Sequence, residues 1–126
     1  VMIKWLDCIR DSKAPLIFGE GDTTMDFVHV KDISQANIGA LINDVTDESF
    51  NVGNCEETSL KQLLELILEV NNSDLKPKHM DETSYNPVSK RIADITKAKT
   101  LLDYNPKYNL KDGLKELSDW YFDKQK

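Results

Sequence analysis

The sequence contains little of what several protein classes require. Its two cysteines, Cys8 and Cys55, make no disulfide framework and stand at no metal-ligand spacing. Its two histidines, His29 and His79, have no cysteine or carboxylate at ligand spacing either, so we expect no metal site. No apolar run approaches the ~20 residues that cross a bilayer. These shortages argue against a disulfide-rich secreted domain, a metalloprotein and a transmembrane protein.

Positive charge is also in short supply. The chain has 16 Lys and Arg residues against 22 Asp and Glu, a net charge of −6. Because an acidic surface repels nucleic acid and anionic lipid, we expect neither as the main partner. A phosphate-bearing small molecule is still compatible, since it needs only a few local cations or backbone donors. Charged residues within the first eleven positions are unlike a signal peptide, and we expect a protein of the reducing cytoplasm.

The 126 residues suffice for one domain with a real core but are few for a complete two-domain enzyme. Apolar periodicity and turn signals predict a mixed α/β domain. Ser59 with Gln62, Asp94 and Asn109 are expected to cap helices. The expected helices cover residues 1–11, 33–42, 60–70, 95–102 and 110–121, the last with Leu114, Trp120 and Tyr121 inward.

The stretch from Pro15 to Gly53 organises this prediction. Strands are expected at Leu16–Phe18 and Met25–Val30, joined by a hairpin turn at Gly19–Asp22. Asp32 is expected to end the second strand and to cap the helix that follows, whose small residues would approach a sheet closely. Phe50–Val52 is predicted to be a buried strand.

Several residues admit two interpretations. Asp26 and Asp32 could be paired carboxylates for acid–base chemistry, although Asp32 as a helix cap and Asp26 as a partner of backbone donors is the favoured reading. His29, in an alternating segment, is more typical of a packed residue than of a base. Lys90 and Arg91 lie in an extended piece within 88–93 and point to opposite faces, so one could reach an anion while the other meets solvent.

The order and spacing of short motifs closely resemble the C-terminal half of the extended short-chain dehydrogenases/reductases, the NAD-dependent epimerase/dehydratase family of nucleotide-sugar enzymes. The resemblance covers nearly the whole chain. The motifs are Ile17-Phe18-Gly19-Glu20-Gly21, Asp26-Phe27-Val28-His29-Val30-Lys31-Asp32, Ala36-Asn37, Phe50-Asn51-Val52-Gly53, Thr58-Ser59-Leu60, Arg91-Ile92-Ala93-Asp94, Lys97-Ala98, Leu101-Leu102, Pro106, Leu110, Gly113-Leu114 and Trp120.

The resemblance implies that residues 1–126 are the C-terminal, sugar-nucleotide-binding portion of such an enzyme. They would comprise the last part of a Rossmann-type sheet, with Phe50–Val52 at its edge, and most of the small substrate-binding domain. The family's Gly-rich dinucleotide fingerprint and its catalytic Tyr-x-x-x-Lys are absent from this sequence. The N-terminal dinucleotide-binding portion is therefore expected to be missing, and this chain alone should neither bind NAD productively nor transfer hydride.

Residue-by-residue transfer of the resemblance predicts part of a substrate site and no catalytic residue or metal ligand. Leu16, Ile17 and Phe18 match the strand that holds the nucleobase. Met25 stands where many members carry a diphosphate-binding arginine, and Ser84 falls near a second such position. Arg91 is then the best remaining cation for the diphosphate, because the planar fork of a guanidinium suits it.

The function that the resemblance implies for the full protein is NAD-dependent 4-epimerisation of a UDP-sugar, an isomerase activity. A nucleotide-sugar 4,6-dehydratase is the alternative within enzymes. Outside enzymes, the chain could be a non-catalytic nucleotide-sugar-binding or interaction module. A homodimer formed through an exposed sheet edge is a further possibility.

Overall fold

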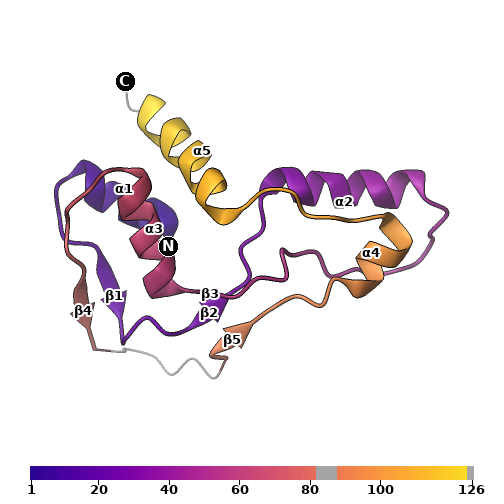
Figure 1. Ribbon diagram of the computed structural model, residues 1–126, viewed down its shortest axis with the longest axis horizontal. Coiled ribbons are helices and arrows are strands. Elements are labelled where there is room, and N and C mark those ends of the chain that lie inside the picture. Colours follow the sequence, from indigo (N-terminus) through magenta and orange to yellow (C-terminus); the bar gives the residue numbers. More distant parts are fainter. Residues whose placement is uncertain (82–87, 125–126) are drawn as a thin grey trace.

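A computed structural model describes residues 1–81 and 88–124 of the chain. It has a mixed α/β structure, with two helical lobes joined by short strands (Figure 1). No helix within these residues has the length and hydropathy that a transmembrane span requires. The elements are α1 (Met2–Arg10), β1 (Leu16–Phe18), β2 (Thr24–Met25), α2 (Val30–Ile42), β3 (Thr58–Ser59), α3 (Leu60–Val70), β4 (Lys78–Met80), β5 (Lys90–Arg91), α4 (Thr96–Leu102) and α5 (Leu110–Asp123).

The first lobe packs α1, α3 and α5 around one apolar core. The predicted capping box starts α3, since the Ser59 hydroxyl accepts from the Gln62 N–H and the Gln62 side chain accepts from the Ser59 N–H. Asn109 caps α5 as predicted. Trp120 of α5, however, is 51% exposed rather than inward. The buried members of this core are Trp5, Leu6, Ile17, Leu63, Leu64, Ile67, Leu114 and Tyr121.

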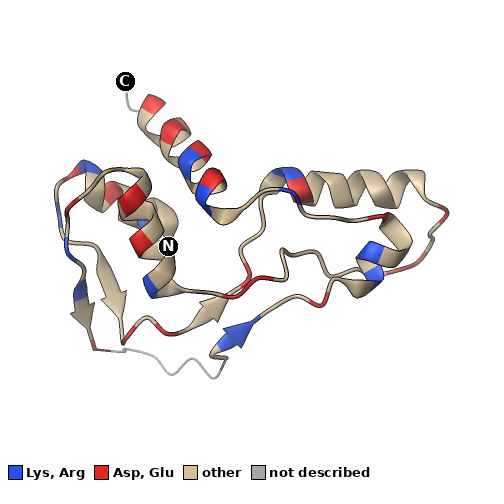
Figure 2. Ribbon diagram, viewed as in Figure 1, with Lys and Arg blue, Asp and Glu red and all other residues tan. Residues whose placement is uncertain are grey.

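The second lobe consists of α2 and α4. The small residues of α2 permit a close approach, as expected, but to α4 rather than to a sheet. A Cβ placed on Gly39 would lie 2.6 Å from the carbonyl oxygen of Leu102, so this contact requires glycine. After its first turn α2 carries no charged residue, which Figure 2 shows as a long uncoloured helix.

The strands form two small sheets rather than the expected hairpin. β1 pairs in parallel with β4, whereas β2 pairs antiparallel with β3 and parallel with β5. The hairpin prediction for Gly19–Asp22 is therefore wrong. Gly19 and Gly21 have positive φ angles of 67° and 77°. The Gly21 carbonyl accepts from the Lys61 N–H at 3.1 Å, which directs the chain toward the start of α3 and away from β1.

The predicted strand Met25–Val30 is also wrong beyond Met25. The Asp26 side chain binds backbone groups of other segments, and α2 already begins at Val30. The cap of α2 is His29, whose Nδ1 accepts from the Lys31 N–H at 3.2 Å. Asp32 lies in the first turn instead of capping it; its fully buried carboxylate accepts from the N–H groups of Lys107 (2.9 Å) and Tyr108 (3.2 Å).

Residues 50–52 are not a strand in the described part of the chain. Phe50 and Val52 pack against the second core, which contains Ile95 and Tyr104, so the expected burial is present. No neighbouring strand lies beside them among the described residues to complete a ladder. Asp94, expected to cap α4, stands just before the cap residue Ile95, although its side chain still accepts from the Thr96 N–H at 3.0 Å.

Candidate functional site

A cleft lies where β2 and β5 run side by side. The parallel register places Met25 opposite Arg91, so two of the predicted site residues come together. The cleft has a volume of about 500 Å³, within the range of small-molecule sites. Its lining residues are Met25, Asp26, Val52, Gly53, Lys90, Arg91, Ile92 and Ala93.

The Asp26 carboxylate holds the wall of this cleft together. It accepts backbone N–H groups from Asn54 at 2.8 Å, Cys55 at 3.0 Å and Ala93 at 3.2 Å. Gly53 permits the arrangement, because a Cβ there would lie 2.4 Å from Asp26 Oδ2. The favoured reading of Asp26 as a partner of backbone donors is thus confirmed.

The two basic residues of β5 differ in their partners. Lys90 is bound to Glu57, which also accepts from the Thr24 hydroxyl at 2.7 Å. The hydrogen bond from Lys90, followed by that from Thr24, lowers the pKa of Glu57. Arg91 is exposed and has no side-chain partner among the described residues. Arg91 is therefore the cation of this cleft that an anionic ligand could engage without breaking an existing ion pair.

β1 does not line the cleft, and its three predicted residues behave differently. Ile17 is buried in the first core at 3% exposure, so its side chain cannot contact a ligand. Leu16 and Phe18 are 42% and 54% exposed. The carbonyl of Pro15 and the N–H of Gly19 bond to β4, so the alternation of a parallel strand directs the peptide groups of Phe18 to the opposite edge, where the Trp5 indole N–H donates to the Leu16 carbonyl at 2.9 Å.

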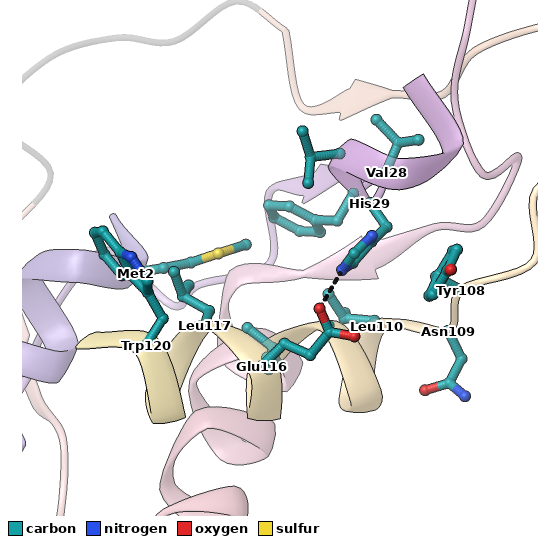
Figure 3. Close-up of a pocket in the computed structure, with 13 residues that line it drawn as sticks. Met2, Val28, His29, Tyr108, Asn109, Leu110, Glu116, Leu117 and Trp120 are labelled. Atoms are coloured by element: carbon teal, nitrogen blue, oxygen red, sulfur yellow. Dashed lines mark ion pairs between the residues drawn. The ribbon is translucent and has the colours of Figure 1, made fainter. Parts of the chain in front are cut away.

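A second cleft, of about 480 Å³, lies between α5 and the segment before α2 (Figure 3). His29 stacks on Tyr108 with ring centroids 4.5 Å apart, and its Nε2 is 3.6 Å from Glu116 Oε2. Lys31 donates to both oxygens of Glu116 at 2.9 Å, which lowers the pKa of Glu116. His29 is thus packed and hydrogen-bonded, as predicted. The other walls are mostly apolar and include Met2, Phe27, Leu117 and Trp120.

The charges of this second cleft are paired with one another, whereas the β2–β5 cleft presents an unpaired guanidinium. Of the two clefts, the one between β2 and β5 therefore offers an anionic group a cation that is not already paired among the described residues. Within residues 1–81 and 88–124, no three histidine, cysteine or carboxylate side chains converge as metal ligands.

The described residues do not fit a dinucleotide. Gly19 and Gly21 join two strands, whereas a dinucleotide loop joins a strand to a helix N-terminus. None of these residues can be assigned to hydride transfer. Ser84, the second expected phosphate position, lies outside the described residues.

Sequence reasoning did not identify Gly53 and Val52 as cleft residues. They follow α2 by about ten positions, and long-range contacts bring them beside β5: Asp26 accepts from the Asn54 N–H, and the Tyr104 hydroxyl donates to the Gly53 carbonyl. The second cleft was missed for a similar reason, since His29, Tyr108 and Glu116 come from distant parts of the sequence. A glycine after an apolar segment was the available signal for Gly53, but it indicates a close approach without naming the partner.

Comparison with known proteins gives consistent relatives. The family model described as GDP-mannose 4,6 dehydratase matches residues 3–117. UDP-glucuronate 4-epimerase of Thermodesulfobacterium geofontis is 30% identical over 119 residues, which cover 94% of this chain and 35% of the relative. The structure of a UDP-glucose 4-epimerase from Thermotoga maritima with UDP-glucose matches with a TM-score of 0.91 at 30% identity, covering 99% of this chain and 40% of that one. UDP-glucuronic acid 4-epimerase from Bacillus cereus, in complex with UDP-glucuronic acid and NAD, matches with a TM-score of 0.87 at 25% identity, covering 97% and 39%.

This chain thus spans 35 to 40% of the length of these relatives. The predicted α/β class is confirmed, since the fold corresponds to about two fifths of an extended short-chain dehydrogenase epimerase. The family model covers most of the chain, which confirms the predicted resemblance. The chain belongs to the NAD-dependent epimerase/dehydratase family, the extended short-chain dehydrogenases that modify nucleotide sugars.

Proposed function

We propose that residues 1–126 are the C-terminal, sugar-nucleotide-binding portion of a cytoplasmic NAD-dependent 4-epimerase that acts on a UDP-sugar. The observation that carries the proposal is the β2–β5 cleft, in which Arg91 has no side-chain partner among the described residues. A guanidinium can meet two oxygens of a diphosphate at once. The UDP-glucose and UDP-glucuronic acid named with the solved epimerases support the substrate class.

Each predicted site residue then has a distinct role. Arg91 binds the diphosphate, and Met25, directly opposite in the register, contributes an apolar wall at the position where the family resemblance leads us to expect an arginine. Phe18 offers an exposed ring and outward peptide groups to the nucleobase, with Leu16 beside it. The Ile17 side chain anchors β1 in the first core. It therefore does not contact the base itself, contrary to the expectation.

The redox step is assigned outside this chain. When NAD is bound in a family enzyme, it supplies transient oxidation of the sugar, and the residues described here hold and orient the substrate instead. We therefore expect this chain alone to be inactive. A nucleotide-sugar 4,6-dehydratase is the alternative, supported by the description of the matching family model.

Isothermal titration calorimetry of the chain with UDP-glucose, UDP-glucuronic acid and, separately, NAD tests the proposal. We expect a UDP-sugar to bind in the absence of NAD, and NAD itself not to bind. Binding of NAD without a UDP-sugar would contradict the assignment of the two ligands to different portions. If neither UDP-sugar binds, the substrate site is not held by this chain on its own and the proposal fails.

A further inference from the structure

A single carboxylate connects the three strands of the sheet that contains β2 and β5. Glu57 immediately precedes β3, and each of its two oxygens binds a different strand. Oε1 accepts from the Thr24 hydroxyl of β2 at 2.7 Å, and Oε2 accepts from the Lys90 ammonium group of β5. Because the strand order is β3, β2, β5, Glu57 reaches from one edge of the sheet to the other (Figure 1).

The register separates these contacts from the cation of the cleft. Thr24 pairs with Lys90, and Met25 pairs with Arg91. Since successive residues of a strand point to opposite faces, the bonds to Glu57 lie on one face of the sheet and Arg91 lies on the other. Glu57 is not one of the described residues that line the β2–β5 cleft. Its influence on a ligand there must therefore act through the strands or through its charge.

Few other contacts orient β5. It pairs with β2 at the positions of Lys90 and Arg91, which makes a very short ladder. On the C-terminal side, the Asp26 carboxylate accepts from the Ala93 N–H at 3.2 Å. The residue that carries the free guanidinium thus lies between two points that carboxylates hold, Ala93 by Asp26 and Lys90 by Glu57. Loss of either tie would give β5 more freedom to move.

We infer that Glu57 is a positioning residue of the sugar-nucleotide site: by binding Lys90 and Thr24 it holds β5 so that the Arg91 guanidinium faces the diphosphate. The inference rests on the proposed function. The Lys90 and Glu57 side chains are 60% and 36% exposed, and an exposed ion pair contributes little to stability because water and salt screen it. We therefore expect the role of Glu57 to show in ligand affinity rather than in the free energy of unfolding.

Charge alone predicts the opposite effect for Glu57. Removing a carboxylate near an anion site should strengthen the binding of a diphosphate, and the released Lys90 would add to the attraction. If Glu57 positions Arg91, its removal should weaken binding instead. Lys90→Gln removes a cation and should weaken binding under either explanation. The double variant separates the two explanations, because its charge changes cancel while the lost positioning remains.

The test is calorimetry of the 126-residue chain with UDP-glucose for the wild type, Glu57→Gln, Lys90→Gln and the double variant. Thr24→Val removes the other bond to Glu57 without changing any charge. Glu69→Gln is the matched control, since it removes the same charge and an exposed ion pair of the same kind, to Lys111 at 2.7 Å, outside the cleft. The Tm of every variant is measured in parallel.

We expect Glu57→Gln, Lys90→Gln and the double variant each to weaken UDP-glucose binding about threefold to tenfold, because all three break the same tie. Thr24→Val should weaken it at least about twofold, and Glu69→Gln should stay within about twofold of the wild type. The Tm of Glu57→Gln should stay within about 2 °C of the wild type.

Tighter binding by Glu57→Gln, or wild-type affinity in the double variant, would overturn the inference and leave the proposed function in place. An equal loss of affinity in the Glu69→Gln control would overturn it as well, as would a fall of more than about 5 °C in the Tm of Glu57→Gln, which would indicate a role in folding. A wild-type chain that does not bind UDP-glucose would overturn the proposed function and this inference together.

Discussion

Replacing Asp26 by Asn should destabilise the chain by about 2–3 kcal/mol. Asp26 Oδ2 accepts the N–H groups of Cys55 and Ala93, and Oδ1 accepts that of Asn54. An asparagine side chain has one acceptor oxygen. If this oxygen keeps the N–H groups of Cys55 and Ala93, the NH2 group of the asparagine faces the N–H of Asn54. The loss of one hydrogen bond to a charged group corresponds to about 1.5–3 kcal/mol, and two donors then oppose each other.

Gly53→Ala perturbs the same contact from the side of Gly53. The added Cβ would lie 2.4 Å from Asp26 Oδ2 and 2.6 Å from the Cβ of Ala93, so the carboxylate must move. Because both substitutions disrupt the same contact, their effects on the free energy of unfolding should not add; we expect the double variant to lose at least about 1 kcal/mol less than the sum. Urea unfolding of the four proteins measures this coupling. Additive effects, or an Asp26→Asn variant within about 0.5 kcal/mol of the wild type, would refute the role assigned to Asp26.

Further substitutions test other parts of the account. Tyr104→Phe removes the buried hydrogen bond to Gly53 and should lower the free energy of unfolding by about 1–1.5 kcal/mol in urea. Burial, followed by the charges of Asp32 and Asp26, raises the pKa of Tyr104 from 10.0 to about 12. The folded state therefore retains the proton longer than the unfolded state, and wild-type stability should hold below pH 10 and fall between about pH 10 and 12, by on the order of 2 kcal/mol. Urea unfolding across this range should show a smaller fall in Tyr104→Phe; a fall remains because the hydrogen bond to Asp7 raises the pKa of Tyr121 as well. Ser59→Ala removes the cap of α3 and should destabilise the chain by about 1 kcal/mol in the same assay. Arg91→Ala should weaken UDP-sugar affinity by about 1.5–3 kcal/mol in calorimetry, and an affinity unchanged relative to the wild type would remove Arg91 from the site.

The helices were predictable because their signals are local. The apolar spacing of residues 60–70 and the pair Ser59 and Gln62 predict both the body and the start of α3, and the structure has both. Asn109 likewise predicts the start of α5. Caps and periodicity depend on residues within one or two turns, so a single sequence contains the information.

The strands were less predictable because their pairing is not local. Residues 25–30 alternate as a strand should, yet Asp26 binds three distant N–H groups and His29 caps α2. Asp32 shows the same effect, since its position before an apolar pattern indicates a cap while its actual partners are more than 70 residues away. Tertiary hydrogen bonds of these two carboxylates, Asp26 and Asp32, overrode the local pattern.

The site was predictable only in part. The family resemblance selected Met25 and Arg91, and the structure places them in register on adjacent strands. It also selected Ile17, whose side chain is buried in the first core and cannot contact a ligand. Which of two neighbouring cations is available could not be read from the sequence, because the partner of Lys90 is Glu57, in a loop 33 positions away.

The most direct test of the central claim is an NMR titration of the isotopically labelled chain with UDP-glucose, which maps the amide shifts along the sequence. We predict the largest shifts at Met25, Arg91 and Phe18, with little change at Tyr108 and Trp120 of the second cleft. Shifts confined to the second cleft, or no shifts at saturating UDP-glucose, would contradict the account of a sugar-nucleotide site between β2 and β5.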